Sequence, residues 1–158
     1  MSLSNRIAIT LTVVFLIASL IVVVQKRYTF CVQYDKSVYF TLGLLDKYNR
    51  KVEKGSYYAF MFYAVNNERY GHQFVKKVGC VEGEHLYNVG REFYCNGDYI
   101  GTAKEKDKKG NPAPLFNYDG IIGKGKFFAI GEMIDSYDSK YWGFVDNNWI
   151  IGKVIKIW

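Results

Sequence analysis

An apolar run close to the amino terminus constrains how the rest of this chain can fold. The 18 consecutive residues from Ile7 to Val24 carry no charge, and most of them are Ile, Leu, Val or Ala. A run of this length is about the shortest helix that crosses a bilayer. A cleaved signal peptide is the competing interpretation, but the run exceeds the usual ~7–15 apolar residues and no small-x-small cleavage site precedes Gln25. We therefore expect an uncleaved anchor at residues 7–24, behind a short cytoplasmic segment at residues 1–6.

The charges around the anchor do not settle its orientation. Arg6 and the amino terminus lie on one side, and Lys26 and Arg27 lie on the other, so the positive-inside count is nearly balanced. The whole chain has 158 residues and a net charge of +6, which suits an anionic surface but identifies no partner. Residues 28–158 are enough for one domain and too few for two full ones.

The composition of this domain predicts a mainly β fold. Aromatic residues make up 18% of the chain and there are only 2 prolines, which excludes a disordered or collagen-like polypeptide. Helix signals after residue 25 are weak, with at most one short turn around Leu44 to Lys51. Runs rich in aromatic and β-branched residues predict strands within Tyr28–Tyr34, Ser56–Val65, Gln73–Gly79 and Trp149–Trp158.

A hairpin is the clearest local prediction. Asn96-Gly97 stands between two β-prone dipeptides within Glu92–Gly101, which is the strongest short-range hairpin signal in the chain. The Lys-rich stretch Thr102–Pro114 that follows is predicted to run over the surface. We therefore expect a hairpin and loop excursion at about residues 92–125.

The cysteines and histidines give no metal signature. Cys31, Cys80 and Cys95 form no CxxC pair, and with only two histidines there is no credible four-ligand zinc set, so we expect no metal and no cofactor. Outside the cytoplasm, Cys80 and Cys95 are able to pair as a disulfide across 14 intervening residues, with Cys31 left over. In a reducing compartment all three are expected to be buried small hydrophobes, and the sequence leaves this choice open.

One serine and one lysine have the placement that a nucleophile and its base require. Ser37 lies in a loop shortly after the first predicted strand, and Lys76 shares a strand face with Phe74 and Val78, whereas Lys77 points to the opposite face as a solvated charge. A lysine accepts a proton from serine near neutral pH only if burial lowers its pKa well below ~10.4. Taken alone, the two residues fit a turn serine and a lysine that extends its ammonium group to solvent better than they fit a catalytic pair.

Five segments strengthen the serine–lysine hypothesis. They are the stretch at Ser37, VEKGSYYAFMF (Val52–Phe62), FVKKVGCVEGE (Phe74–Glu84), EFYCNGDYIG with the following GNPAPL, and SYDSKYWGFV (Ser136–Val145). In the order and spacing of these segments, the chain resembles the signal peptidase I family across most of its length after the anchor. Within that family it is most similar to the TraF-type conjugative-transfer peptidases.

The resemblance implies a role for each matching residue. Ser37 matches the nucleophile, and its backbone N–H matches an oxyanion donor. Lys76 matches the general base, and Ser136 matches a serine that holds the lysine amine by a hydrogen bond. Asp138 and Lys140 match a salt-linked pair that supports the site. The implied fold is a signal-peptidase-like, β-rich catalytic domain behind one amino-terminal transmembrane helix.

Several positions depart from the family pattern. No proline follows Ser37, and Asp35 stands where many relatives have a hydroxyl that donates to the oxyanion, which an ionised carboxylate cannot do. Glu132 replaces the family's Asp after Gly131, and Lys140 replaces its Arg and so loses the bidentate fork. Asp35 and the missing proline favour an alternative in which the protein is a catalytically impaired scaffold that only binds components of the transfer apparatus. The presence of Ser37, Lys76, Ser136 and Asp138 together opposes it.

The resemblance implies a single-pass serine endopeptidase of the bacterial inner membrane, with its catalytic domain on the periplasmic, extracytoplasmic side. We expect its partners to be the lipid bilayer and a membrane-inserted precursor, most plausibly a pilin of a conjugative type IV secretion system, cleaved by hydrolysis or with cyclisation. We expect a monomer with no nucleic-acid partner. A general signal peptidase I is the alternative within the enzyme class, and the anchor disfavours a cytoplasmic self-cleaving repressor.

Overall fold

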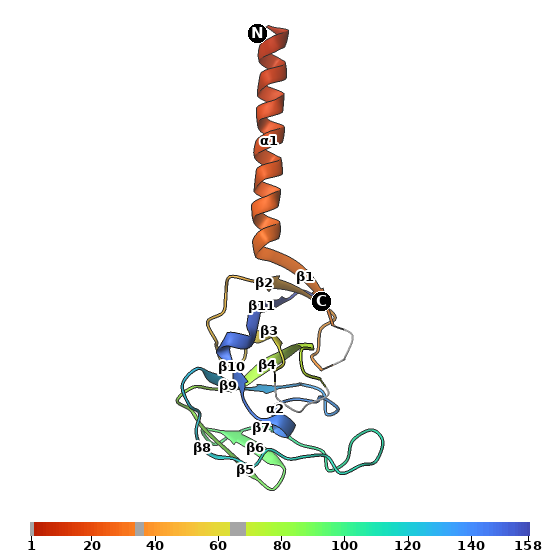
Figure 1. Cartoon of the computed structure of the whole chain (residues 1–158), viewed down its shortest axis with the longest axis vertical. Coiled ribbons are helices and arrows are strands. Elements are labelled where there is room, and N and C mark those ends of the chain that lie inside the picture. The colour runs from red at the N-terminus through yellow and green to blue at the C-terminus, as the bar shows by residue number, and fades with distance from the viewer. Residues whose placement is uncertain (1, 34–36, 64–68) are drawn as a thin grey trace.

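The structure is a computed structural model that describes residues 2–33, 37–63 and 69–158. A long helix, α1 (Leu3–Arg27), leads directly into a β-rich domain (Figure 1). Its amino-terminal end is capped by Ser2, whose side chain accepts a hydrogen bond from the Asn5 N–H. At ~1.5 Å per residue, its 25 residues reach about 37 Å, which is long and apolar enough to cross a membrane.

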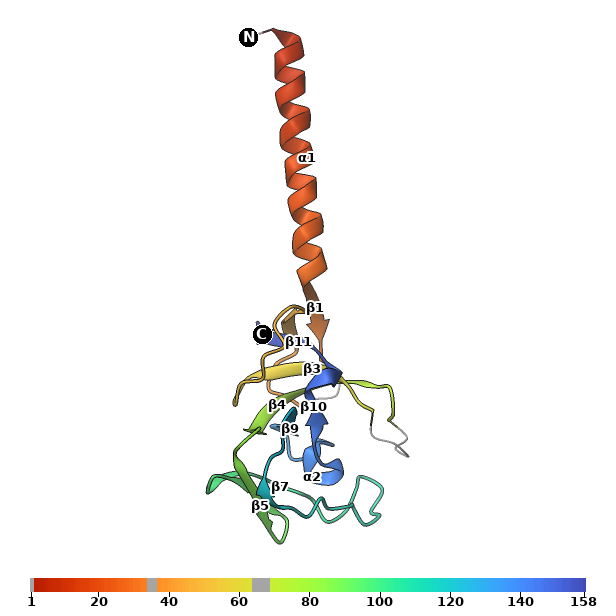
Figure 2. The same ribbon diagram turned by 60° about the vertical axis from the view of Figure 1, so that its left-hand side comes forward.

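Two antiparallel sheets make up the β-rich domain. In the first sheet, of seven strands, the order is β1-β2-β11-β3-β4-β9-β10, and in the second, of four, it is β7-β6-β5-β8, as counted over the described residues. In Figures 1 and 2 the first sheet lies next to α1 and the second lies at the far end of the molecule. The strands of the first sheet are β1 (Tyr28–Val32), β2 (Leu42–Asp46), β3 (Tyr57–Met61), β4 (Gln73–Val81), β9 (Lys126–Ile130), β10 (Val145–Asp146) and β11 (Ile150–Lys156). Those of the second are β5 (His85–Val89), β6 (Glu92–Cys95), β7 (Asp98–Thr102) and β8 (Asp119–Ile121).

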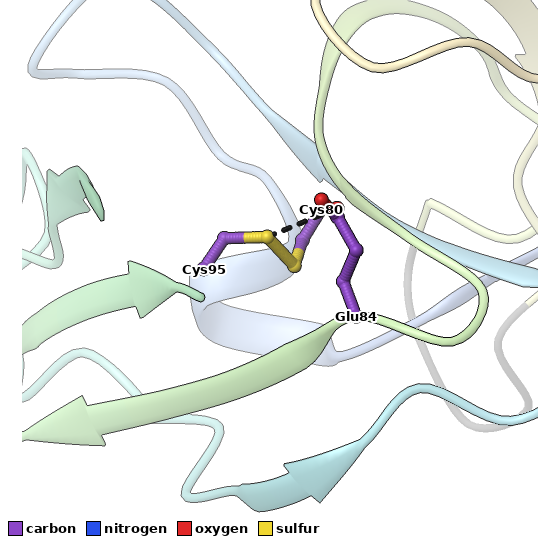
Figure 3. Close-up of side chains that lie close together, drawn as sticks. All are labelled: Cys80, Glu84 and Cys95. Atoms are coloured by element: carbon purple, nitrogen blue, oxygen red, sulfur yellow. Dashed lines mark hydrogen bonds between the residues drawn. A yellow bond between two sulfur atoms is a disulfide. The ribbon is translucent and has the colours of Figure 1, made fainter. Parts of the chain in front are cut away.

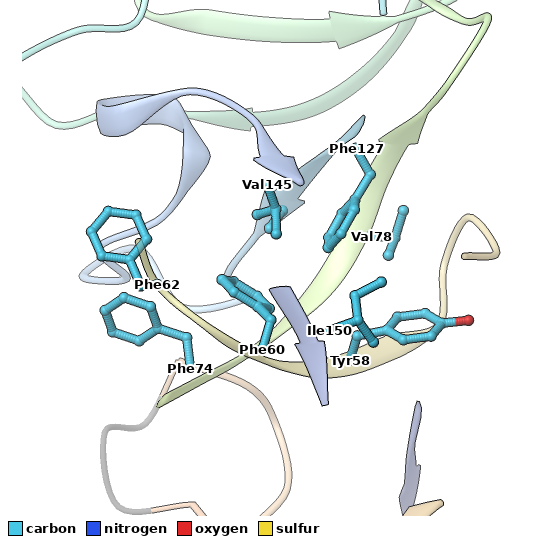
Figure 4. Packing of buried hydrophobic residues seen from close by; sticks show 9 residues of the cluster. Tyr58, Phe60, Phe62, Phe74, Val78, Phe127, Val145 and Ile150 are labelled. Atoms are coloured by element: carbon cyan, nitrogen blue, oxygen red, sulfur yellow. The ribbon is translucent and has the colours of Figure 1, made fainter. Parts of the chain in front are cut away.

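Strand β3 lies at the centre of the core because it is apolar on both faces. Tyr58 and Phe60 pack into one cluster, and Ala59 packs into another on the opposite face. Figure 4 shows the first of these clusters, in which the Phe60 ring meets the Phe127 ring edge-on. Its labelled members are Tyr58, Phe60, Phe62, Phe74, Val78, Phe127, Val145 and Ile150. The mainly β fold predicted from the sequence is confirmed.

The predicted hairpin is present as β6 and β7. Asn96 and Gly97 connect the two strands with positive φ angles of 52° and 90°. Two consecutive left-handed residues are what a type I′ turn needs, and this turn matches the twist of the strands that it joins.

The short turn predicted around Leu44–Lys51 begins in the wrong place. Leu44 to Asp46 belong to strand β2, which pairs with β1 on one side and with the distant β11 on the other. The SYDSKYW loop contains one turn of helix, α2 (Ser139–Trp142), capped by Asp138. A single turn is too short to produce a helical period in the sequence. A 3₁₀ turn, η1 (Asn147–Trp149), precedes β11.

A disulfide links the two sheets. Cys80 of β4 and Cys95 of β6 are bonded, with their Cα atoms 5.7 Å apart (Figure 3), while Cys31 is free. A carboxylate oxygen of Glu84 lies 3.1 Å from Cys95 Sγ, so these three side chains form a cluster of potential metal ligands. Because the two sulfurs are bonded to each other, neither is a thiolate that could bind a metal ion.

Candidate active site

Lys76 is a buried lysine on strand β4, between β3 and β9 in the first sheet. Only 1% of the residue is exposed, and it lies opposite Tyr58 of β3 in the register of the sheet. Its Nζ donates a hydrogen bond to Ser136 Oγ at 3.1 Å and lies 5.4 Å from the centre of the Phe74 ring. An amine in such apolar surroundings is desolvated and held in one orientation, which are the conditions that a lysine base requires.

Gly131 brings two serines together at the end of β9. A Cβ atom on this glycine would lie 1.8 Å from Ser136 Oγ and 3.1 Å from the backbone oxygen of Ser37. Only a residue without a side chain lets both serines approach so closely. The structure therefore brings Ser37, Ser136 and Lys76 into one neighbourhood, although they come from three separate parts of the chain.

Ser37 itself is buried, with 1% of the residue exposed. Its backbone oxygen accepts a hydrogen bond from the Glu132 N–H at 2.8 Å. The residues that follow it, Val38 and Phe40, are buried in the cluster beneath β3. Asp35, whose carboxylate departs from the family pattern, lies outside the described residues.

Glu132 connects the residues that follow Ser37 to strands β3 and β4 of the first sheet. Its carboxylate accepts hydrogen bonds from the Tyr39 N–H (3.0 Å), the Tyr57 hydroxyl (2.8 Å) and the Lys77 ammonium group (3.3 Å). Burial alone raises the pKa of Glu132, but these three donors outweigh it, so the net pKa is below its ordinary value. Burial, together with the hydrogen bond to Glu132, raises the pKa of Tyr57 to about 12.

Sequence reasoning missed this arrangement. It assigned no role to Glu132 and took Lys77 to be a solvated charge, whereas the structure pairs the two. One signal was available: Lys77, next to the assigned lysine, and Glu132, directly after Gly131, are unassigned charges of opposite sign.

Asp138 and Lys140 form a buried ion pair, with Lys140 Nζ 2.6 Å from Asp138 Oδ2. The Asp138 carboxylate also accepts from the backbone N–H groups of Lys140 (3.1 Å) and Gly131 (2.7 Å). It therefore caps α2 and fixes Gly131 at the same time. In addition, Trp142 of α2 packs on Phe62, with ring centres 4.7 Å apart, so the whole turn is held against the core.

A groove of about 700 Å³ lies between β1 and the beginning of β4. One wall is Thr29–Gln33, and the other includes Gln73–Val75, which directly precedes Lys76. His72, to which the sequence analysis gave no role, lines this groove together with Arg69 and Lys47.

The site and the fold together define a class of protein. A β-rich domain behind an apolar helix contains a buried lysine whose amine donates a hydrogen bond to one buried serine, and a second buried serine lies beside the same glycine. The signal peptidase, peptidase S26 family matches residues 4–158, and the chain belongs to this family.

Individual relatives match shorter segments. The signal peptidase I of Buchnera aphidicola subsp. Acyrthosiphon pisum (strain APS) is 51% identical over 39 residues, which are 24% of this chain and 12% of that protein. The signal peptidase I of B. aphidicola subsp. Schizaphis graminum (strain Sg) is 42% identical over 52 residues, 32% of this chain and 15% of that protein. These matches thus span only a small part of the relatives' length. A crystal structure of a signal peptidase I from Enterococcus faecalis V583 aligns with 66% of this chain and 97% of its own, at 20% identity and a TM-score of 0.44.

Proposed function

We propose that this protein is a membrane-anchored serine endopeptidase in which Ser37 is the nucleophile and Lys76 is the general base. The observation that carries the proposal is the buried hydrogen bond from Lys76 Nζ to Ser136 Oγ, formed next to a second buried serine, Ser37. Membership of the signal peptidase family supports the same activity.

The reaction is an acyl transfer. Ser37 Oγ attacks the carbonyl carbon of the scissile peptide bond while its proton passes to the neutral Lys76 amine. The carbonyl oxygen becomes negatively charged, and the Ser37 N–H donates to it. The lysine then gives its proton to the leaving amine, which breaks the C–N bond and leaves an ester on Ser37. Water, activated by the same lysine, cleaves the ester and restores both residues.

The supporting residues act through these two. Ser136 orients the Lys76 amine, and Asp138 holds Gly131 so that Ser136 keeps its place. The Asp138–Lys140 pair takes no part in proton transfer and instead fixes the turn that carries Ser136.

The proposed substrate is a membrane-inserted precursor protein. For the TraF-like subtype, it is a pilin of a conjugative type IV secretion system, and attack on the ester by the product's own amino group instead of water would yield a cyclic product. The relatives named signal peptidase I favour a second candidate, a general signal peptidase that processes many exported proteins.

The proposed location is a bacterial inner membrane, with α1 as the anchor and residues 28–158 outside the cytoplasm. The Cys80–Cys95 disulfide supports this side of the membrane, because disulfides persist in oxidising compartments and are rare in the cytosol.

The test is co-expression in membranes with two precursors, a pilin encoded alongside the protein and a general exported protein. The wild type is compared with Ser37→Ala and Lys76→Ala, and with Lys109→Ala in the exposed loop as a control. Intact mass spectrometry reads the products. We expect the wild type and the control to shorten the pilin and both site variants to leave it intact, and a product one water lighter than the linear chain shows cyclisation.

Other outcomes separate the alternatives. Shortening of both precursors indicates a general signal peptidase. If the folded, inserted wild type leaves both masses unchanged, the peptidase proposal fails and the scaffold alternative replaces it.

A further inference from the structure

The junction between the anchor and the β domain has no linker. Helix α1 ends at Arg27 and strand β1 begins at Tyr28, so one element continues into the next, as Figure 2 shows. The backbone oxygen of Arg27 accepts a hydrogen bond from the Lys47 N–H at 3.0 Å, and Tyr28 pairs with Asp46 in the register of β1 and β2. The last residue of the helix is thus already bonded to the sheet.

A bidentate ion pair reinforces this junction. Arg27 Nε donates to Asp46 Oδ1 at 3.0 Å, and its NH2 group donates to Asp46 Oδ2 at 2.8 Å. Two parallel bonds fix the orientation of a guanidinium group as well as its position. The Asp46 carboxylate is itself held, because only 7% of its side chain is exposed and Oδ1 also accepts from the Tyr48 N–H. The hydrogen bonds from Arg27 lower the pKa of Asp46 below its ordinary value.

Asp46 connects the junction to the candidate active site through contiguous strands. It pairs with Lys153 of β11, and its backbone oxygen lies against Gly152, where a Cβ atom would come within 2.3 Å. Strand β11 pairs with β3, and β3 pairs with β4, where Lys76 lies opposite Tyr58. Every step from the helix end to Lys76 is therefore a hydrogen-bonded contact between neighbouring strands.

We propose that the Arg27–Asp46 pair acts as a clasp that joins the anchor and the peptidase domain into one rigid body, and so determines where a membrane-spanning precursor is cut. The clasp holds Lys76 and Ser37 at a fixed height above the bilayer. A precursor whose apolar segment lies in the same bilayer then presents one particular peptide bond at that height. This inference rests on the proposed function, and Arg27 and Asp46 are positioning residues that take no part in the chemistry.

The test uses the full-length protein in vesicles and a series of membrane-spanning precursors. In this series the spacer between the apolar segment and the scissile bond is lengthened one residue at a time. The variants are Arg27→Gln, Asp46→Asn and an insertion of Gly-Ser-Gly-Ser after Arg27. Lys54→Gln, which removes the Lys54–Glu84 ion pair within the domain, is the matched control.

We expect the wild type and the control to favour one spacer length, with the cut position read by mass spectrometry. The clasp variants should raise cleavage at other spacer lengths about tenfold, the lower end of what loss of a charge-assisted hydrogen bond produces. Cleavage of a short soluble peptide should stay unchanged, because the site itself is intact. An unchanged spacer preference in Arg27→Gln and in the insertion variant would overturn the clasp.

A second measurement does not depend on activity. Spin labels on unnatural amino acids at positions 4 and 109, both exposed, report the distance between the far end of α1 and the domain. A narrow distance distribution that broadens in Arg27→Gln supports the clasp, even if no precursor is cleaved and the proposed function fails. A distribution that is equally broad in both proteins contradicts it, whatever the activity.

Discussion

Gly131 is the residue on which the geometry of the candidate site depends most. In Gly131→Ala the new Cβ would lie 1.8 Å from Ser136 Oγ and 3.1 Å from the Ser37 oxygen, so both serines must move. We expect the precursor cleavage rate to fall about 100-fold, since a displacement of ~1 Å at reacting groups has that effect. The cost in stability should be about 1–3 kcal/mol, as is usual for overpacking. Cleavage assays and thermal unfolding measure the two effects separately.

Gly123 offers the matched control for that substitution. A Cβ atom there would have no neighbour within 4 Å, so Gly123→Ala should leave the cleavage rate unchanged. If the wild type and both alanine variants cleave the precursor at the same rate, the close approach of Ser37 and Ser136 to Gly131 is not needed for activity.

Glu132 gives a prediction that depends on pH. The pKa of its carboxyl group is below the ordinary value of 4.5 because three donors outweigh the effect of burial. A lowered folded-state pKa contributes stability above the unfolded-state pKa, and that contribution is lost as the pH falls through the folded-state value. The wild type should therefore be more stable than Glu132→Gln at pH 7, and the difference should shrink below about pH 4.5. Urea unfolding across this pH range measures it.

The catalytic consequence of the same substitution separates positioning from general stability. In Glu132→Gln the Lys77 ion pair is lost and the Tyr39 segment is held less firmly, so kcat should fall while KM stays unchanged. Glu132→Asp keeps the charge and should recover part of kcat. If kcat falls equally in both variants, and only as far as the fraction of unfolded protein accounts for, the positioning role of Glu132 is contradicted.

At the scale of elements, local patterns predict the hairpin and the buried strands but not every pairing. Asn96-Gly97 predicts its turn because two left-handed residues have strong sequence preferences. Strand β2 was missed because its strand character comes from β1 and β11, and β11 lies more than a hundred residues away. The Glu132 contacts were missed for the same reason, since Tyr39, Tyr57 and Lys77 are all distant in sequence.

The disulfide adds a covalent cross-link between the two sheets, and it closes a loop between residues 15 apart in sequence. In the chain-entropy account, a loop of this size contributes about 3 kcal/mol to stability. We expect the double variant Cys80→Ala/Cys95→Ala to lose about 2–4 kcal/mol in the free energy of unfolding. Cys31→Ala, which leaves the bridge intact, is the control. Equal unfolding midpoints for the double variant and the wild type in denaturant would disprove this contribution.

At the scale of the whole molecule, the disulfide and the anchor bear on the same question, which is the side of the membrane on which the domain lies. Arg6 and the amino terminus balance Lys26 and Arg27, so charge does not decide the orientation. The Cys80–Cys95 bond does favour one side, because it would not persist in a reducing cytosol. In the proposed location, α1 anchors the domain to the membrane, and the disulfide supports the side outside the cytoplasm.

This orientation predicts the outcome of protease protection in spheroplasts of a cell that expresses the full chain. With residues 1–6 in the cytoplasm, an epitope tag inserted after Lys109, in the exposed loop, should be cleaved by protease added outside. A tag at the amino terminus should survive until the membrane is permeabilised. Trapping of free thiols in intact cells should at the same time modify Cys31 and leave Cys80 and Cys95 unmodified. A protected Lys109 tag together with three modified cysteines would place the domain in the cytoplasm and contradict the proposed location.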